Sequence, residues 1–112
     1  MEITRLFVLS EPNRKVLEVR ERGRFLVTLL RDNETNKCVY LTRPRVLKLR
    51  FQIQSFIEFF RIRNCVLEIT SRRTPHTVKL NLSELIKLNR IIPLVVRRIY
   101  ELRTRNQTSR RG

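Results

Sequence analysis

The sequence holds few of the side chains that enzyme catalysis requires. His76 is the single histidine, and it lies between Pro75 and Thr77 in an arginine-containing segment. The two cysteines, Cys38 and Cys65, are too few for a zinc cluster or a disulfide scaffold. The sequence has no pair of carboxylates, glycine-rich phosphate loop, nucleophile motif or metal-ligand spacing. It therefore predicts a protein that is not an enzyme and that has no cofactor and no metal.

The charged side chains are suited to binding a polyanion. The 112 residues include 25 Lys and Arg against 10 Asp and Glu, which gives a net charge of +15. Of these cations, 20 are arginine, whose planar guanidinium group stacks on bases and binds phosphates through paired hydrogen bonds. This composition favours a nucleic acid over an acidic membrane surface. The excess is uneven, +5 in residues 1–60 and +10 in residues 61–112.

Alternating apolar residues predict six β-strands. A tight turn is expected at Gly23, which adopts positive φ at no steric cost, and a polar loop is expected over residues 32–36. The predicted strands cover residues 3–9, 15–21, 24–31, 37–41, 65–69 and 77–82.

Apolar residues spaced by three and four predict two amphipathic helices. The first should begin after Thr42 as N-cap and end near Asn64, and the second should begin after Ser83 as N-cap. Pro93 lies inside the second helix and is expected to kink or divide it. The positions expected to pack the helices together are Val46, Leu49, Ile53, Phe56, Phe60, Leu85, Leu88, Ile92, Val95 and Ile99.

The two helical patterns superimpose at an offset of 39 residues, and the strands before them also match. A strand–strand–helix unit is therefore predicted over residues 24–63 and again over 65–102, after an N-terminal hairpin over 3–21. The predicted fold class is α+β, with antiparallel strands and two helices in the order ββββα-ββα. An intrachain pseudo-twofold axis should relate the two units, with their helices packed together. This domain covers residues 1–103, and residues 104–112 are expected to form a disordered basic tail.

Several segments resemble the positive cofactor four family of transcriptional coactivators. Residues 77–88 (Thr-Val-Lys-Leu-Asn-Leu-Ser-Glu-Leu-Ile-Lys-Leu) are similar to the last strand and helix start of that family, and residues 38–49 resemble them more loosely. Residues 17–27 are similar to its first two strands and the basic turn between them. The resemblance implies four strands followed by a helix, dimerisation through that helix, and binding of single-stranded DNA across curved sheets. The Whirly and PUR proteins use similar strand–helix units.

The chain departs from the family in ways that leave its assembly open. It has no tryptophan, and Val46 and Leu85 replace the family's aromatic residue at the helix start. The second copy also lacks two strands. Both a homodimer and a monomer with an internal pseudo-dimer, as in PUR proteins, are compatible with this pattern.

Strand alternation predicts a binding surface. It turns Tyr40 and Lys79 outward and places Arg20 and Arg22 opposite Leu17 and Val19. Sites for single strands combine such a cationic surface with aromatic rings on which bases stack. The residues expected to contact nucleic acid are Arg20, Arg22, Arg24, Lys37, Tyr40, Arg72, Arg73, His76 and Lys79. The predicted function is binding of single-stranded DNA or RNA, dominated by the phosphate backbone, in transcription, replication or packaging.

A second hypothesis starts from the phenylalanines of the first helix. Phe51, Phe56, Phe59 and Phe60 all lie there. Under this hypothesis the helix docks a protein partner or a second copy of the chain, and nucleic-acid binding is secondary.

The apolar segments are short. Residues 6–9 follow Glu2 and are too short for a signal peptide, and no apolar run approaches the ~20 residues of a membrane span. We expect an intracellular protein, nuclear or nucleoid-associated, that is not secreted and has no membrane partner.

Overall fold

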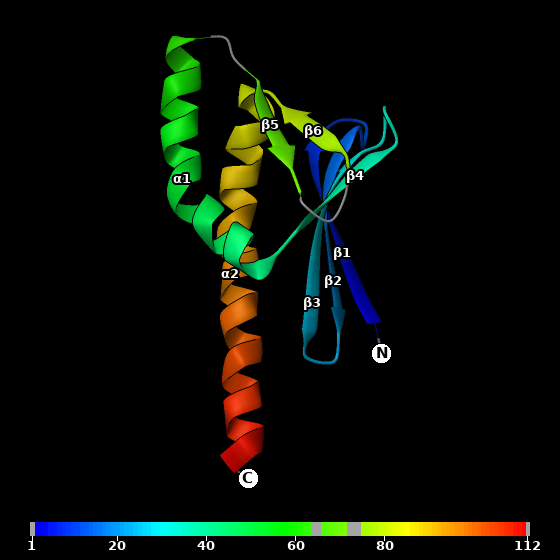
Figure 1. Ribbon diagram of the computed structural model, residues 1–112, viewed down its shortest axis with the longest axis vertical. Coiled ribbons are helices and arrows are strands. Elements are labelled where there is room, and N and C mark those ends of the chain that lie inside the picture. The colour runs from blue at the N-terminus through cyan, green and yellow to red at the C-terminus, as the bar shows by residue number, and fades with distance from the viewer. Residues whose placement is uncertain (1, 64–65, 72–74, 112) are drawn as a thin grey trace.

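The computed structural model describes residues 2–63, 66–71 and 75–111, the last eight of them by their backbone alone. It confirms the α+β class and the order ββββα-ββα (Figure 1). The elements are β1 (Glu2–Ser10), β2 (Lys15–Arg22), β3 (Phe25–Asp32), β4 (Lys37–Leu41), α1 (Arg43–Ile62), β5 (Leu67–Thr70), β6 (Thr77–Leu80) and α2 (Leu82–Arg111).

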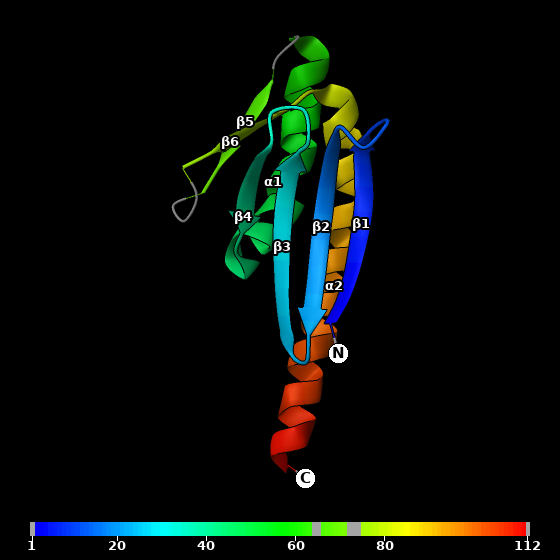
Figure 2. The same ribbon diagram turned by 90° about the vertical axis from the view of Figure 1, so that its right-hand side faces the viewer.

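The strands form two antiparallel sheets. One is four-stranded in the order β1-β2-β3-β4, and β5 and β6 form a separate ribbon (Figure 2). The turn between β2 and β3 has Gly23 at φ +60°, a conformation that glycine adopts without steric cost. The strand–strand–helix order thus occurs twice, but β3 and β4 are joined to two further strands while β5 and β6 stand alone. The pseudo-twofold relation between the two units stays a prediction.

Helix α2 lies along the inner face of the four-stranded sheet, and α1 packs against α2 (Figures 1 and 2). Two ion pairs fix α2 along β2: Lys15 with Glu84, at 2.9 Å between Nζ and Oε1, and Glu21 with Arg98. The two anchor points are about 20 Å apart along the strand and about 21 Å apart along the helix. This match lets α2 run parallel to β2 and makes it the element that joins the two sides of the molecule.

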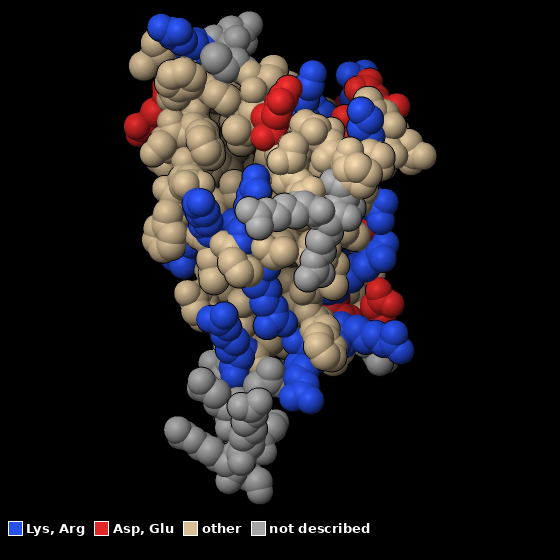
Figure 3. All heavy atoms as spheres, in the orientation of Figure 1, with Lys and Arg blue, Asp and Glu red and all other residues tan. Residues whose placement is uncertain are grey.

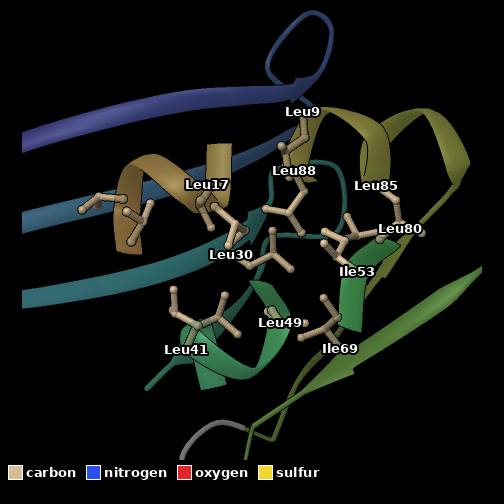
Figure 4. Close-up of a cluster of buried hydrophobic side chains, with 14 of the residues drawn as sticks. Leu9, Leu17, Leu30, Leu41, Leu49, Ile53, Ile69, Leu80, Leu85 and Leu88 are labelled. Carbon is tan, nitrogen blue, oxygen red and sulfur yellow. The ribbon is translucent and has the colours of Figure 1, made fainter. Parts of the chain in front are cut away.

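Alternate strand residues and one stripe of each helix form the core (Figure 4). Nine of the ten predicted helix positions are buried there, and Phe56 is the exception. Phe56 is only half-buried, in a depression between α1 and β5 that Leu67 and Ile69 also line. Ile57, 2% exposed, lies in the core instead. Spacings of three and four from Ile53 lead to both residues, so periodicity alone did not decide between them.

The beginning of α1 was predicted correctly, whereas that of α2 was not. Thr42 caps α1, because its side chain accepts a hydrogen bond from the Arg45 amide at 3.4 Å. Asn81, rather than Ser83, caps α2. The Asn81 side chain accepts from the Glu84 amide at 2.9 Å, and the Glu84 carboxylate accepts from the Asn81 amide at 2.8 Å. This reciprocal pair needs an acidic residue three positions after the cap, which Ser83 lacks.

The remainder of α2 corrects two further expectations. The helix continues through Pro93 without a break, and Figure 1 shows no sharp bend there. Pro93 is exposed, so water can satisfy the carbonyl that loses its partner. The helix also extends over residues 104–111, where a disordered tail was expected. Arginine and glutamine are good helix formers, and extending a helix costs less than nucleating one.

In the described part of the chain, no helix is long and apolar enough to span a membrane.

Candidate nucleic-acid interface

One face of the four-stranded sheet is turned away from the helices, and we call it the outer sheet face. Along β3, Leu26, Thr28 and Leu30 are buried against the helices, while Phe25 and Leu29 point the other way. Figure 2 views the molecule from this side, with the helices behind the sheet. The face therefore belongs to an ordered sheet, and neither helix covers it.

A carboxylate at the centre of the outer sheet face holds two arginines. Glu18 accepts from Arg31 Nε at 2.7 Å and from an Arg20 terminal nitrogen at 3.2 Å. Glu18 is 8% exposed, whereas both arginines remain partly exposed. A guanidinium group has five N–H donors, so both arginines keep donors for a ligand anion. Glu18 thus fixes two cationic planes on the sheet surface.

The ionisation of this cluster follows from its contacts. Burial acts to raise the pKa of Glu18, but the hydrogen bonds and charges of Arg31 and Arg20 outweigh it, and the pKa is lowered. The hydrogen bond to Glu18 in turn raises the pKa of Arg31. The Glu18 carboxylate and the Arg31 guanidinium group are therefore charged at neutral pH.

Two aromatic rings flank the arginine cluster. Tyr40 lies in the same cross-strand row as Leu29 and Glu18. Arg20 lies in the next row on the same face, where it pairs with Val27. Phe25 pairs with Arg22 at the end of the sheet nearest the Gly23 turn, and it is 68% exposed. A phenylalanine this exposed adds nothing to the core. Its position beside an arginine suits it to stacking on a base.

Three of the predicted contact residues, Arg20, Arg22 and Tyr40, share the outer sheet face. Arg24 lies in the adjoining turn, where its carbonyl accepts from an Arg43 terminal nitrogen at 3.0 Å. This hydrogen bond joins the turn to the start of α1.

Other predicted contact residues lie apart from this face. Lys37 pairs with Asp32 at the opposite end of the sheet. Lys79 lies in β6, and His76 directly precedes that strand. The Lys79 Nζ atom is 3.8 Å from Oε1 of Glu68. Arg72 and Arg73 lie outside the described residues, as does Cys65.

The sequence prediction missed Phe25 and Arg31, which the sheet places beside the expected residues. Alternation through β3 was the available signal, because Phe25, Val27, Leu29 and Arg31 all share one face. The contact of Glu18 with Arg31 could be predicted only from the register between β2 and β3, which sequence periodicity does not supply. Cys38 is a half-buried free thiol that pairs with Arg31 in the register.

The excess positive charge is not concentrated on the sheet. Residues 1–42 contain eight Lys and Arg against six Asp and Glu, whereas residues 43–112 contain 17 against four. Within the described residues, no group of His, Cys, Asp and Glu could hold a metal ion. The outer sheet face is therefore an organised surface of rings and arginines with a small net charge.

No family model matches the sequence, and comparisons with curated proteins and with solved structures find no significant match. The resemblance to the positive cofactor four family consequently stays a prediction.

Proposed function

We propose that the protein is a non-enzymatic binder of single-stranded DNA or RNA and that it holds the strand across the outer sheet face. The observation that carries the proposal is the set of Arg20, Arg22 and Arg31 interleaved with Phe25 and Tyr40 on one uncovered face. The function implied by the resemblance to the positive cofactor four family agrees with it. The net charge further suggests an intracellular setting where nucleic acid is present, a nucleus or a nucleoid.

The arrangement favours unpaired over paired bases. Phe25 and Tyr40 project from a sheet surface, and their rings offer π-faces that only an unstacked base can cover. Each base stacked on an aromatic ring contributes about 1–3 kcal/mol. The arginines between the rings can donate to the phosphates that join the stacked nucleotides. Stacking would then supply the preference for single strands, and arginine contacts would fix the path of the backbone.

The proposal is tested by titrating labelled single-stranded and duplex oligonucleotides, DNA and RNA, with wild type and a Phe25→Ala/Tyr40→Ala variant. We expect wild type to prefer single strands. Loss of both rings should weaken single-strand binding by at least about 30-fold and leave duplex binding nearly unchanged. The comparison of DNA with RNA identifies the preferred ligand.

Two controls accompany this experiment. A Phe25→Tyr/Tyr40→Phe variant keeps both rings and should bind like wild type. A Phe59→Ala variant removes an exposed ring of α1 and should also have no effect. Equal loss of affinity for single strands and duplex, or wild-type binding by the ring-deleted variant, would refute binding across the outer sheet face.

A second function is supported by the exposed side of α1. Phe51, Phe59 and Ile62 are exposed there, opposite the buried stripe of the same helix. This is the surface that docking of a protein partner or a second copy would use. Sedimentation of wild type and a Phe59→Ser/Ile62→Ser variant tests self-association, which the substitutions should abolish if this face forms a dimer.

A further inference from the structure

Residues 43–112, which include both helices and the β5–β6 ribbon, carry most of the unbalanced positive charge. Residues 43–112 have 17 Lys and Arg against four Asp and Glu. Figure 3 shows Lys and Arg side chains in a band over the first turns of α1 and the part of α2 that precedes its grey end. A phosphate backbone would be attracted to this band more strongly than to the outer sheet face, whose arginines share the charge of Glu18.

A shallow groove of about 760 Å³ lies within the band, between α1 and α2. Arg50 of α1 borders it on one side, and Arg97 and Arg98 of α2 border it on the other. Glu101 is the single carboxylate in the lining, and it is shared by Arg97 at 3.4 Å and Arg98 at 2.9 Å. Arg98 is also paired with Glu21 of β2, so the three arginines of the lining face two carboxylates and a net charge of one remains.

Two exposed aromatic rings each lie beneath an arginine: Tyr100 lines the groove, and Phe51 is the neighbour of Arg50, which lines it. The Cζ atom of Arg50 is 5.8 Å from the centre of the Phe51 ring, and that of Arg103 is 6.0 Å from the centre of Tyr100. Phe51 is 77% exposed and Tyr100 is 49% exposed. Since Arg50 and Tyr100 both line the groove, it connects the two pairs. A guanidinium plane on a ring is a cation–π arrangement on which a base can also stack.

We propose that this groove binds a second segment of single-stranded nucleic acid, so that one protein molecule holds two strands on opposite sides. The inference rests on the proposed function of the outer sheet face and extends it to strand bridging. The groove lining contains arginine and no lysine, and arginine is the cation that stacks on bases as well as binding phosphates. This composition favours a nucleic acid over an acidic peptide as the occupant.

The stoichiometry of a short oligonucleotide tests the proposal. A single strand of about eight nucleotides is titrated into protein held well above the dissociation constant, followed by fluorescence anisotropy. Wild type should bind two oligonucleotides. The Arg50→Ala/Arg97→Ala/Arg103→Ala variant should bind one. A matched Arg61→Ala/Arg63→Ala/Arg90→Ala variant, which loses three exposed arginines outside the groove, should still bind two.

A bridging measurement separates the groove from the outer sheet face. An immobilised strand should capture a labelled second strand through wild type, and the groove variant should lose capture while still binding the immobilised strand. If the Phe25→Ala/Tyr40→Ala variant also binds two oligonucleotides, the proposed function of the sheet fails independently of the groove.

Three results would overturn the groove proposal. The first is a single oligonucleotide bound by wild type, and the second is two bound by the groove variant. The third is displacement of the second oligonucleotide by a polyglutamate peptide of equal charge, because it would show that the groove selects any acidic chain.

Discussion

The outer sheet face and the groove between α1 and α2 use the same residue types in different arrangements. On the sheet, buried Glu18 holds Arg20 and Arg31, and strand register sets the positions of the rings. At the groove, Arg50 lines it and lies over Phe51 of its own helix, and Tyr100 lines it and lies beneath Arg103 of its own helix. On the first surface a buried carboxylate fixes the arginines, whereas the second surface lies on residues 43–112, the part of the chain that carries most of the net positive charge.

This contrast separates two contributions to binding. Stacking on rigidly placed rings distinguishes unpaired from paired bases, whereas counterion release from phosphates supplies affinity that is independent of base and sensitive to salt. A search for the most basic part of the chain would select residues 43–112, and a search for ordered aromatic residues would select the sheet. Under the proposed function, net charge alone therefore does not locate the surface that distinguishes unpaired from paired bases.

The largest expected effect is unfolding of the protein when a charge is introduced into the core that supports both surfaces. Val95 of α2 and Ile57 of α1 are buried in the core. A Val95→Asp or Ile57→Asp substitution would bury an unpaired carboxylate, at a cost of several kcal/mol that a small domain does not tolerate. Circular dichroism melts should show an unfolded protein in both cases. Phe56→Asp, at the half-buried neighbouring position, is the control and should retain a cooperative transition. A cooperative, wild-type-like melt of Val95→Asp would contradict the packing described.

An intermediate effect should appear in the salt dependence of binding. With about five phosphates neutralised on a single strand, the logarithm of affinity should fall with the logarithm of salt at a slope of about −3.5. On an oligonucleotide long enough to reach both surfaces, the Arg50→Ala/Arg97→Ala/Arg103→Ala variant should lower this steepness by about 2. The Phe25→Ala/Tyr40→Ala variant should weaken binding at every salt concentration without changing the slope. Equal changes of slope in both variants would remove the distinction between the surfaces.

The smallest expected effect concerns the pH dependence of stability. Because the pKa of Glu18 is lowered in the folded protein, its ion pairs stabilise fully above its unfolded pKa of about 4.3. That contribution disappears as pH falls through the lower folded value. Glu18→Gln should cost on the order of 1 kcal/mol at neutral pH, and its Tm should fall less than that of wild type between about pH 5 and about pH 3. Glu34→Gln, at an exposed pair with Arg14, is the control. Parallel pH curves for Glu18→Gln and wild type would contradict the role of Glu18.

Local patterns predicted most of the fold. Alternation in the strands and spacings of three and four in the helices gave the element order and most of the core. The errors have local causes of their own. Phe56 and Ile57 both fit the helical period, and the reciprocal hydrogen bonds of Asn81 and Glu84 identify a helix start that Ser83 does not.

The candidate site was less predictable because it depends on contacts between strands. Alternation placed Arg20, Arg22 and Tyr40 on outward positions, but only the register shows that Arg31 and Glu18 lie among them. The groove was not predicted, since it arises where two helices distant in sequence meet. Summed charge indicated a polyanion without indicating which side of the molecule would carry most of that charge.

Photo-crosslinking of a thiouridine- or thiothymidine-substituted single strand tests base recognition by the outer sheet face, because the peptides that it labels report where the bases lie. We expect crosslinks to peptides of β3 and β4 that contain Phe25 and Tyr40, and these should persist in the Arg50→Ala/Arg97→Ala/Arg103→Ala variant. Crosslinks confined to α1 and α2, around Phe51 and Tyr100, would contradict base recognition by the outer sheet face.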